Sequence, residues 1–229
     1  YAGKPVVIKP KSTNFGLGIT ILKHNYDETD FKGALQIAFE HDNTVLIEKF
    51  IPGREFRIFI INDEVVGILH RVPANVTGDG VLNIGQLIDR KNEDPLRGKG
   101  YRTPLEKIRK GREEEMFLKQ QGMDFNTVPK EGEVVYLREN SNISTGGDSI
   151  DFTDDIDDSY KAIAVEAAKA LNVKITGLDM MIQDIHAPAT PDNYAIIEMN
   201  FNPAIHIHCY PFKGKNRHLN HKMIRALGF

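Results

Sequence analysis

Residues 198–203 read EMNFNP, and they follow an apolar run, Tyr194 to Ile197, that predicts a buried strand. Glu198 and Asn200 stand two positions apart, so on a strand their side chains point to the same face. A carboxylate and an amide oxygen side by side suit a hard cation such as Mg²⁺ or Mn²⁺. An ordinary polar strand end has the same composition, so the assignment depends on the rest of the chain.

A second apolar run, Gly177 to Ile182, contains a single acid, Asp179. The run predicts another strand, and it makes Asp179 a candidate for the third oxygen ligand of the same cation. Further along, His206 and His208 stand two apart, but no other His or Cys follows at zinc spacing. That spacing favours polar contacts over a metal role for the two histidines.

The composition is that of an ordinary globular protein. The chain has 229 residues, of which 41% are hydrophobic and 27% are charged, and its formal net charge is -3. This charge offers no electrostatic case for nucleic acid or an anionic membrane surface as partner. The single cysteine, Cys209, excludes an internal disulfide framework and fits a reducing compartment. No apolar run approaches the ~20 residues of a membrane span, and the chain begins at Tyr1, so we expect a piece of a longer cytoplasmic protein.

The N-terminal segment predicts a hairpin with a glycine-containing tip. Strands are expected at Pro5 to Pro10 and at Ile19 to Leu22, and the residues between them are small or turn-forming. Backbone N–H groups and hydroxyls in such a loop can wrap a triphosphate, and lysines add point charges. The Gly-Lys-Ser/Thr ending of a P-loop is missing, and a plain solvated hairpin is the alternative. The candidate phosphate-binding residues are Lys9, Lys11, Ser12, Gly16 and Gly18.

Residues 44–72 predict three strands around a Pro52-Gly53 turn. The first runs from Thr44 to Ile51, and the runs Arg54 to Ile61 and Val65 to Val72 predict an antiparallel hairpin. Extended backbone beside a crevice can present N–H and C=O groups to an adenine edge, and an acid just past the turn can accept from ribose hydroxyls. Solvated charges at a strand edge are the alternative. The candidate nucleotide-binding residues are Glu48, Lys49, Ile51 and Glu55.

The middle of the chain predicts a satellite element and then a polar loop. Residues 89–130 are polar, with one helix expected from Thr103 or Pro104 to about Gln121. A strand from Val134 to Arg138 leads into residues 139–149, which are rich in Ser, Thr, Asn and Gly. Such a loop suits a polar substrate, although a disordered connector has the same composition. Further helices are expected from Asp27 or Thr29 to about His41, from Thr153 or Asp154 to about Leu171, and from Leu219 to Leu227.

Taken in order, these parts resemble the ATP-grasp superfamily of carboxylate–amine ligases. The segments KPKSTNFG at 9–16, NISTGG at 142–147 and NFNP at 200–203 resemble more closely the C-terminal glutathione synthetase module of bacterial bifunctional enzymes, whose N-terminal part is a glutamate–cysteine ligase. Cyanophycin synthetases share the Ser-Thr-Gly-Gly loop. The resemblance covers essentially the whole chain. It implies an α+β fold in which two α+β subdomains with antiparallel sheets enclose a nucleotide cleft: residues 1–53 form a small lid subdomain and residues 54–229 a large subdomain with the metal and substrate sites.

The resemblance also implies a role for each candidate residue in the nucleotide site. Lys9 would hold the α- and β-phosphates, and the loop from Ser12 to Gly18 would close over the triphosphate. The segment from Glu48 to Ile51 would frame the adenine, and Glu55 would bind the ribose. Mg²⁺ or Mn²⁺ would be held by Asp179, Glu198 and Asn200, and the peptide substrate would be contacted by Asn142, Ser144, Thr145, Gly146 and Gly147.

One position departs from the pattern of the D-alanine–D-alanine ligases. In those enzymes an arginine stands two residues before the metal-binding aspartate, and here that position is Gly177. The positive charge at the reacting centre must therefore come from elsewhere. Arg138 and Arg71 are the candidates for this catalytic role.

The expected activity is ATP-dependent ligation through an acyl phosphate, joining γ-glutamylcysteine and glycine to give glutathione, ADP and phosphate. The alternatives are a ligase of the cyanophycin or D-alanine type, and a nucleotide-binding module that has lost catalysis. The expected partners are small-molecule substrates, with ATP and Mg²⁺ or Mn²⁺ as cofactors. The residues do not decide which acid and which amine are the substrates. They also leave the oligomeric state open, and a homodimeric parent is one of the alternatives.

Overall fold

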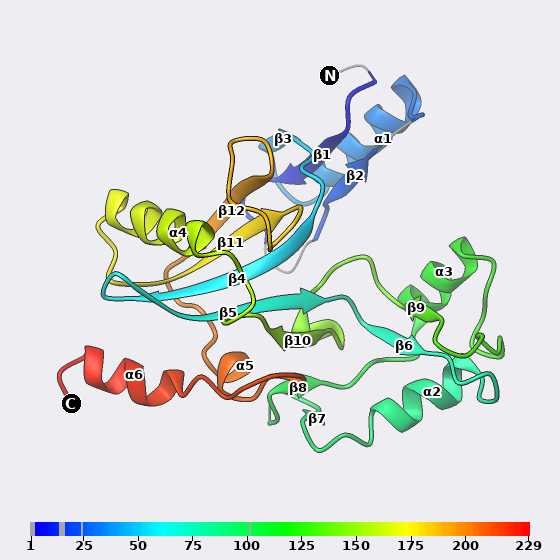
Figure 1. Ribbon diagram of the computed structural model, residues 1–229. Helices are drawn as coiled ribbons and strands as arrows, with labels where there is room; N and C mark the ends of the chain where they lie inside the picture. The colour runs from blue at the N-terminus through cyan, green and yellow to red at the C-terminus, as the bar shows by residue number, and fades with distance from the viewer. Residues whose placement is uncertain (1–2, 14–16, 24, 101) are drawn as a thin grey trace. The chain divides into compact units, whose positions relative to one another are not determined.

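The computed structural model describes residues 3–13, 17–23, 25–100 and 102–229 (Figure 1). The chain divides into two compact units, Tyr1–Pro52 and Gly53–Phe229. Both units combine helices with antiparallel sheets, so the fold belongs to the α+β class. Among the described residues, no helix is both long enough and apolar enough to cross a membrane.

The first unit is, in its described part, a three-stranded antiparallel sheet covered by one helix. The strand order is β2 (Thr20–Leu22), β1 (Val6–Pro10) and β3 (Val45–Lys49), and the helix is α1 (Glu28–Phe39). Alternate residues of β1 are buried, because one face of the sheet packs on α1. The cluster between sheet and helix contains Val6, Ile8, Ala34 and Ala38.

Helix α1 begins where the sequence predicts it, because Asp27 caps it. The Asp27 carboxylate accepts from the backbone N–H groups of Thr29 at 2.7 Å and Asp30 at 2.9 Å. In return, the Asp30 carboxylate accepts from the N–H of Asp27 at 3.0 Å. This reciprocal capping box satisfies donors that have no partner within the helix.

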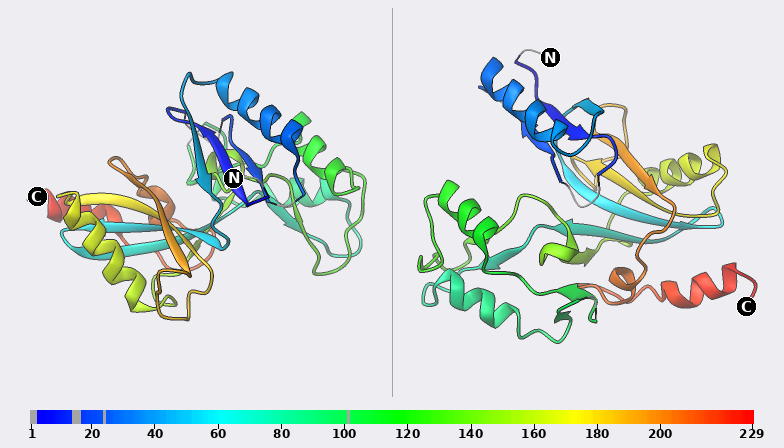
Figure 2. Two further views of the ribbon diagram at one scale, coloured as in Figure 1. Left: turned by 90° about the horizontal axis from the view of Figure 1, so that it is seen from above. Right: turned by 180° about the vertical axis from the view of Figure 1, so that it is seen from behind.

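The second unit is built on a five-stranded sheet among the described residues. Its order is β10 (Asp148–Asp151), β5 (Glu64–Val72), β4 (Arg54–Ile61), β11 (Ile175–Ile182) and β12 (Tyr194–Asn200), and every neighbouring pair is antiparallel. Helix α4 (Asp158–Ala170) covers one face, and α5 (His206–Cys209) and α6 (Leu219–Ala226) lie on the other (Figures 1 and 2). The α4 face holds the main core, with Phe56, Ile58, Leu178, Met180, Tyr160 and Ala164.

Residues 74–137 form a separate layer, called here the platform. Its elements are β6 (Asn75–Thr77), α2 (Ile84–Lys91), β7 (Arg97–Gly98), β8 (Leu105–Glu106), α3 (Arg112–Gln120) and β9 (Val134–Tyr136). Strand β6 pairs with β9, and β7 pairs in parallel with β8. The platform has its own buried cluster, which includes Val76, Ile84, Leu87, Ile88, Ile108, Leu118 and Val135.

The helix expected from Thr103 or Pro104 to Gln121 is wrong over its first part. Residues 105–106 form strand β8 instead, and helix α3 starts only at Arg112. Gly111 occupies the N-cap in an extended conformation, and its N–H donates to the Glu114 carboxylate at 2.9 Å. Gly111 therefore determines where α3 begins, whereas the pattern of apolar residues alone predicted too early a start.

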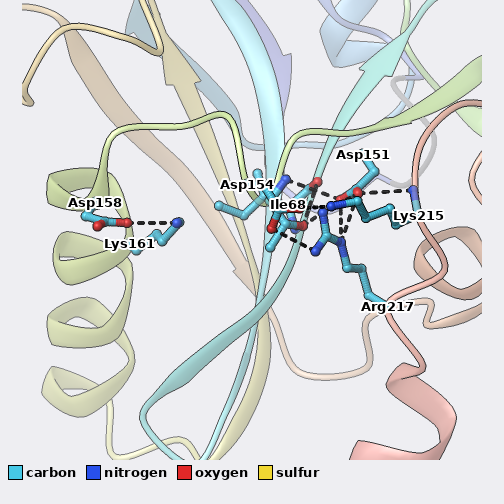
Figure 3. A network of polar contacts seen from close by, with 8 residues as sticks. Ile68, Asp151, Asp154, Asp158, Lys161, Lys215 and Arg217 are labelled. Atoms are coloured by element: carbon cyan, nitrogen blue, oxygen red, sulfur yellow. Dashed lines mark hydrogen bonds and ion pairs between the residues drawn. The ribbon is translucent and has the colours of Figure 1, made fainter.

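A polar network fastens the segment after α5 to strand β10 (Figure 3). Arg217 donates from Nε to Oδ2 of Asp151 at 2.9 Å and from Nη1 to Oδ1 of Asp154 at 2.9 Å, and Lys215 Nζ reaches Asp154 at 2.7 Å. Burial raises the pKa of Asp151, but the hydrogen bonds from Arg217 and Thr153 lower it, and the balance leaves this pKa below its ordinary value. The carboxylate therefore stays ionised at neutral pH.

The network also explains why α4 starts later than expected. Thr153, one of the two expected caps, donates from its hydroxyl to Asp151 Oδ1 at 2.6 Å, and Asp154 is held by Arg217. Asp157 caps the helix instead and accepts from the N–H of Ser159 at 2.9 Å. The helix expected from Leu219 to Leu227 is confirmed, since α6 covers Leu219–Ala226.

Candidate functional site

One face of the five-stranded sheet carries a row of charged and polar side chains, opposite the face covered by α4. Arg57 on β4 pairs with Asp179 on β11, and Asp179 pairs with Glu198 on β12. Two positions along β11, Gly177 pairs with Asn200. The three residues expected to bind metal therefore share one face of two neighbouring strands, because side chains alternate along a strand.

Asp179 lies at the centre of this row and forms ion pairs with two arginines. Arg57 contacts both carboxylate oxygens, with Nη2 2.7 Å from Oδ2, and Nη2 of Arg71 donates to Oδ2 at 3.1 Å. Burial raises the pKa of Asp179, whereas the hydrogen bond from Arg57 and the charges of Arg71 and Arg57 lower it, and the result lies below the ordinary value. Asp179 is therefore a buried but ionised carboxylate.

Arg57 was missed by the sequence analysis, and Gly177 explains why it fits. A Cβ at position 177 would lie 2.7 Å from Cβ of Pro203 and 3.0 Å from Cδ of Arg57. The space that a side chain at position 177 would need is thus filled by the side chain of Arg57 from the neighbouring strand β4. A lone arginine within the apolar run of β4 is the signal that could have found it.

Arg71, one of the two expected catalytic residues, lies in the same row. It is ion-paired with both Asp179 and Glu55, and Glu55 also accepts from the hydroxyl of Ser141 at 3.0 Å. Nε of Arg71 is buried and has no hydrogen-bond partner among the described residues. The candidate ribose-binding acid, Glu55, is thus connected through Arg71 to the candidate metal ligand, Asp179.

Arg138, the other expected catalytic residue, has different partners. It is ion-paired with Glu113, and its Nε donates to Oε1 of the buried Glu114 at 2.7 Å. Both acids belong to helix α3 of the platform. These contacts favour a role for Arg138 in fastening α3, and its catalytic role stays a prediction.

The outer end of the row offers oxygen atoms suited to a divalent cation. Nδ2 of Asn200 donates to Oε1 of Glu198 at 3.1 Å, and the amide oxygen of Asn200 and the second oxygen of Glu198 take no part in this hydrogen bond. Asp179 keeps acceptor capacity beside its arginines, because an ionised carboxylate offers about four lone-pair sites. In the described chain no three His, Cys, Asp or Glu side chains gather as a metal cluster, so the set depends on the amide of Asn200. Two carboxylates and an amide fit Mg²⁺ or Mn²⁺.

The expected phosphate-binding residues belong to the first unit. Nζ of Lys9 is ion-paired with Oε2 of Glu48 at 2.7 Å, so the structure brings two candidate nucleotide-binding residues together. The N–H of Lys11 donates to the carbonyl of Thr44 and that of Ser12 to the Asp42 carboxylate, which fixes the start of the loop. Gly18 has a positive φ of 75°, Lys49 ends β3 and Ile51 follows it. Gly16 lies outside the described residues.

The residues expected to contact the peptide substrate form one turn in the second unit. Residues Ile143–Thr145 make a short 3₁₀ helix whose N-cap is Asn142, and Gly146 follows with a φ of 95°. The hydroxyl of Thr145 donates to the carbonyl of Asn142 at 2.9 Å, and the N–H of Gly147 donates to the same carbonyl at 3.2 Å. This compact turn, 142–147, contains Ser144 as well and leads directly into β10.

Comparisons with known proteins match a family model at the N-terminal part of the chain and two curated relatives and one solved structure along nearly all of it. Residues 2–83 match the family model described as D-ala D-ala ligase C-terminus. The chain is 63% identical to the glutathione biosynthesis bifunctional protein GshAB of Desulfotalea psychrophila over 100% of its length, and 57% identical to the protein of that name from Clostridium perfringens over 99%. The crystal structure of a bifunctional glutathione synthetase from Pasteurella multocida matches with a TM-score of 0.77 and 47% identity, covering 98% of this chain and 31% of that one. The chain spans 29% of the length of each of the two curated relatives.

Proposed function

We propose that this chain belongs to the ATP-grasp superfamily, which its motifs resemble, and that it is the ATP-dependent ligase part of a bifunctional glutathione biosynthesis protein, because it matches a segment of such proteins along its whole length. The proposed reaction joins γ-glutamylcysteine and glycine, with ATP giving ADP and phosphate. The observation that carries the proposal is the 63% identity over the whole chain, together with the row that contains Asp179, Glu198 and Asn200.

The reaction needs ATP because a carboxylate does not react with an amine at neutral pH. Transfer of the γ-phosphoryl group to the carboxylate of γ-glutamylcysteine breaks the bond to ADP and forms an acyl phosphate. The amine of glycine then attacks the acyl carbon, phosphate leaves, and the amine loses a proton as the amide forms. The protein has to neutralise charge, align the reactants and exclude water from an intermediate that hydrolyses.

The residues of the row fit these tasks. Asp179, Glu198 and Asn200 would hold the divalent cation, which supplies charge neutralisation at the phosphates when it is bound. Arg57 and Arg71 keep Asp179 ionised and oriented, and they place positive charge where Gly177 supplies none. In the first unit, Lys9 would exchange its carboxylate partner Glu48 for phosphate oxygens.

The test is ADP release by the full-length protein that contains this chain, measured with Mg²⁺ or Mn²⁺. ADP release that requires both γ-glutamylcysteine and glycine, with glutathione as the product, is the expected result. ADP release with D-alanine or with cyanophycin-type substrates alone would replace the proposal by one of the other ligase types. Nucleotide binding without ADP release on any substrate pair would identify a silent module instead.

A further inference from the structure

Arg97 is a charged residue in the interior of the second unit, at the start of β7. Its side chain is 0% exposed. Nη1 donates to the carbonyl oxygens of Glu106 at 2.8 Å and Gly146 at 2.9 Å, and Nη2 is ion-paired with Asp148. The guanidinium therefore holds both a carbonyl of the turn 142–147 and the first residue of the strand that follows the turn.

Asp148 is shared between two cations, the buried Arg97 and the half-buried Lys91. Nζ of Lys91 reaches Oδ2 of Asp148 at 2.7 Å and also donates to the backbone carbonyl of Asn75 at 2.9 Å. Burial lowers the pKa of Lys91, Asp148 raises it, and the charge of Arg97 lowers it further, so that the pKa lies below its ordinary value. Asp148 alone does not balance two cations, so the charge of Asp94 and the backbone carbonyls that accept from Arg97 and Lys91 supply the remaining negative potential. If the Gly146 carbonyl turned away, a buried N–H of Arg97 would lose its partner.

The glycines of the turn fit closely against its surroundings. A Cβ on Gly146 would lie 2.8 Å from Cα of Ile108 in the platform, and a Cβ on Gly147 would lie 2.8 Å from the carbonyl oxygen of Val72 at the end of β5. Just before the turn, Ser141 donates to Glu55 at 3.0 Å. The turn is thus fixed at one end to the charged row and at the other to Arg97.

We propose that Arg97 is a positioning residue, which holds the carbonyl of Gly146 and the start of β10 so that the turn 142–147 has one conformation ready for the acid substrate. Arg97 itself is buried beneath the turn and does not touch the substrate. The proposal rests on the proposed function, in which this turn contacts γ-glutamylcysteine. It makes the platform a support for the substrate turn, outside the sheet that carries the charged row.

The test compares Arg97→Lys with Lys91→Met in the full-length protein. Lysine keeps the charge beside Asp148 but cannot span Glu106 and Gly146 together, so we expect the KM for γ-glutamylcysteine to rise about tenfold. The kcat and the KM for ATP should stay within about twofold of the wild type. This is expected when the substitution lowers only the fraction of molecules whose turn is in the conformation that binds the acid substrate. Lys91→Met removes the second cation beside Asp148, which keeps the amide of Asn75 as a partner, and in the described chain Lys91 donates no hydrogen bond to the turn. It should lower Tm while leaving that KM unchanged.

The outcomes separate this proposal from the proposed function. If the wild type makes no glutathione, the proposed function fails and the role of Arg97 fails with it. If the wild type makes glutathione and Arg97→Lys has the wild-type KM, or if Lys91→Met raises the KM equally, only the positioning role is overturned. Should Arg97→Lys not fold, the double variant Arg97→Gln with Asp148→Asn keeps the net charge of the cluster, and an unchanged KM in that variant overturns the proposal as well.

Discussion

Arg57 and Asp179 face each other across strands β4 and β11, and Nη2 of the arginine lies 2.7 Å from Oδ2 of the aspartate. Both side chains are buried, at 9% and 3% exposure. Removing one partner of a buried ion pair typically costs about 3–5 kcal/mol, because the other charge is left unpaired. Substitution of Asp179 therefore changes stability and activity together, whereas Glu198 is exposed and allows the two effects to be separated.

Glu198→Gln should lower ligation by at least about a hundredfold, because a charged candidate metal ligand is lost. The free energy of unfolding in urea should stay within about 0.5 kcal/mol of the wild type, as for most exposed substitutions. Asp179→Asn is the comparison, and it should lose both activity and several kcal/mol of stability. Full activity of Glu198→Gln at saturating Mg²⁺ would remove this residue from the set of metal ligands.

Gly177→Ala should disturb the row although it adds only one carbon atom. The new Cβ would lie 2.7 Å from Pro203 and 3.0 Å from the Cδ of Arg57, so the arginine must shift relative to Asp179. We expect a loss of about 1–3 kcal/mol in the free energy of unfolding, as for other overpacked sites, and a fall in kcat. Unchanged values of both quantities would show that Arg57 adapts freely.

Gly33→Ala should have the opposite effect on stability. Gly33 lies inside helix α1, and nothing lies within 4 Å of the position of its added Cβ. Alanine loses less backbone entropy in a helix, so we expect the first unit to gain about 0.5–1 kcal/mol. Thermal unfolding of the two variants side by side measures the contrast, and a lower Tm for Gly33→Ala would contradict the packing described for α1.

His208 should make stability depend on pH between about 3 and its ordinary value. Burial, and then the charge of Arg57, lower its pKa from 6.5 to about 3, and neither ring nitrogen has a hydrogen-bond partner in the described part of the chain. Between these values the unfolded chain binds a proton that the folded chain does not, so the free energy of unfolding falls as pH falls. His208→Leu should reduce this slope by about 1.4 kcal/mol per pH unit between pH 4 and 6.

Urea unfolding at several pH values checks the prediction for His208. His221→Leu, at an exposed position of helix α6, is the matched control for replacing an imidazole by an apolar side chain. His70 is a second contributor to that slope, because burial and then Arg54 lower its pKa to about 4. An unchanged slope in His208→Leu would mean that this imidazole is not held neutral in the folded chain.

The strands could be predicted from the sequence because their signals are local. Alternation and apolar runs located β4, β5, β11 and β12, and the spacing of Glu198 and Asn200 placed them on one face. The expectation that the run from Tyr194 to Ile197 is buried is wrong, because β12 is an edge strand and Ile196 and Ile197 are exposed. The partnership of Arg57 with Asp179 could not be predicted, since it joins residues 122 positions apart and depends on the register of two strands. A one-residue change of that register would move either side chain to the other face.

Other misses arose where several residues compete for one role. Around the start of α4, Thr153 and Asp154 are both good caps, and only their contacts with Asp151 and Arg217 leave Asp157 as the N-cap. The start of α3 depends on Gly111, and the spacing of apolar residues carries no information about a glycine at the N-cap. The roles assigned to the site residues stay predictions, because they concern ligands and not the chain alone.

The platform has a hydrophobic cluster of its own, distinct from the cluster beneath α4. Through Arg97 it holds the turn 142–147, whereas Asp179 and Glu198 belong to the sheet. Mutations that accumulate in the platform would therefore act on the turn only through its support, and would leave the residues of the charged row unchanged. A lineage with this architecture could adjust how firmly the turn is held by changing sixty-odd residues and keep the strands of the large sheet as they were.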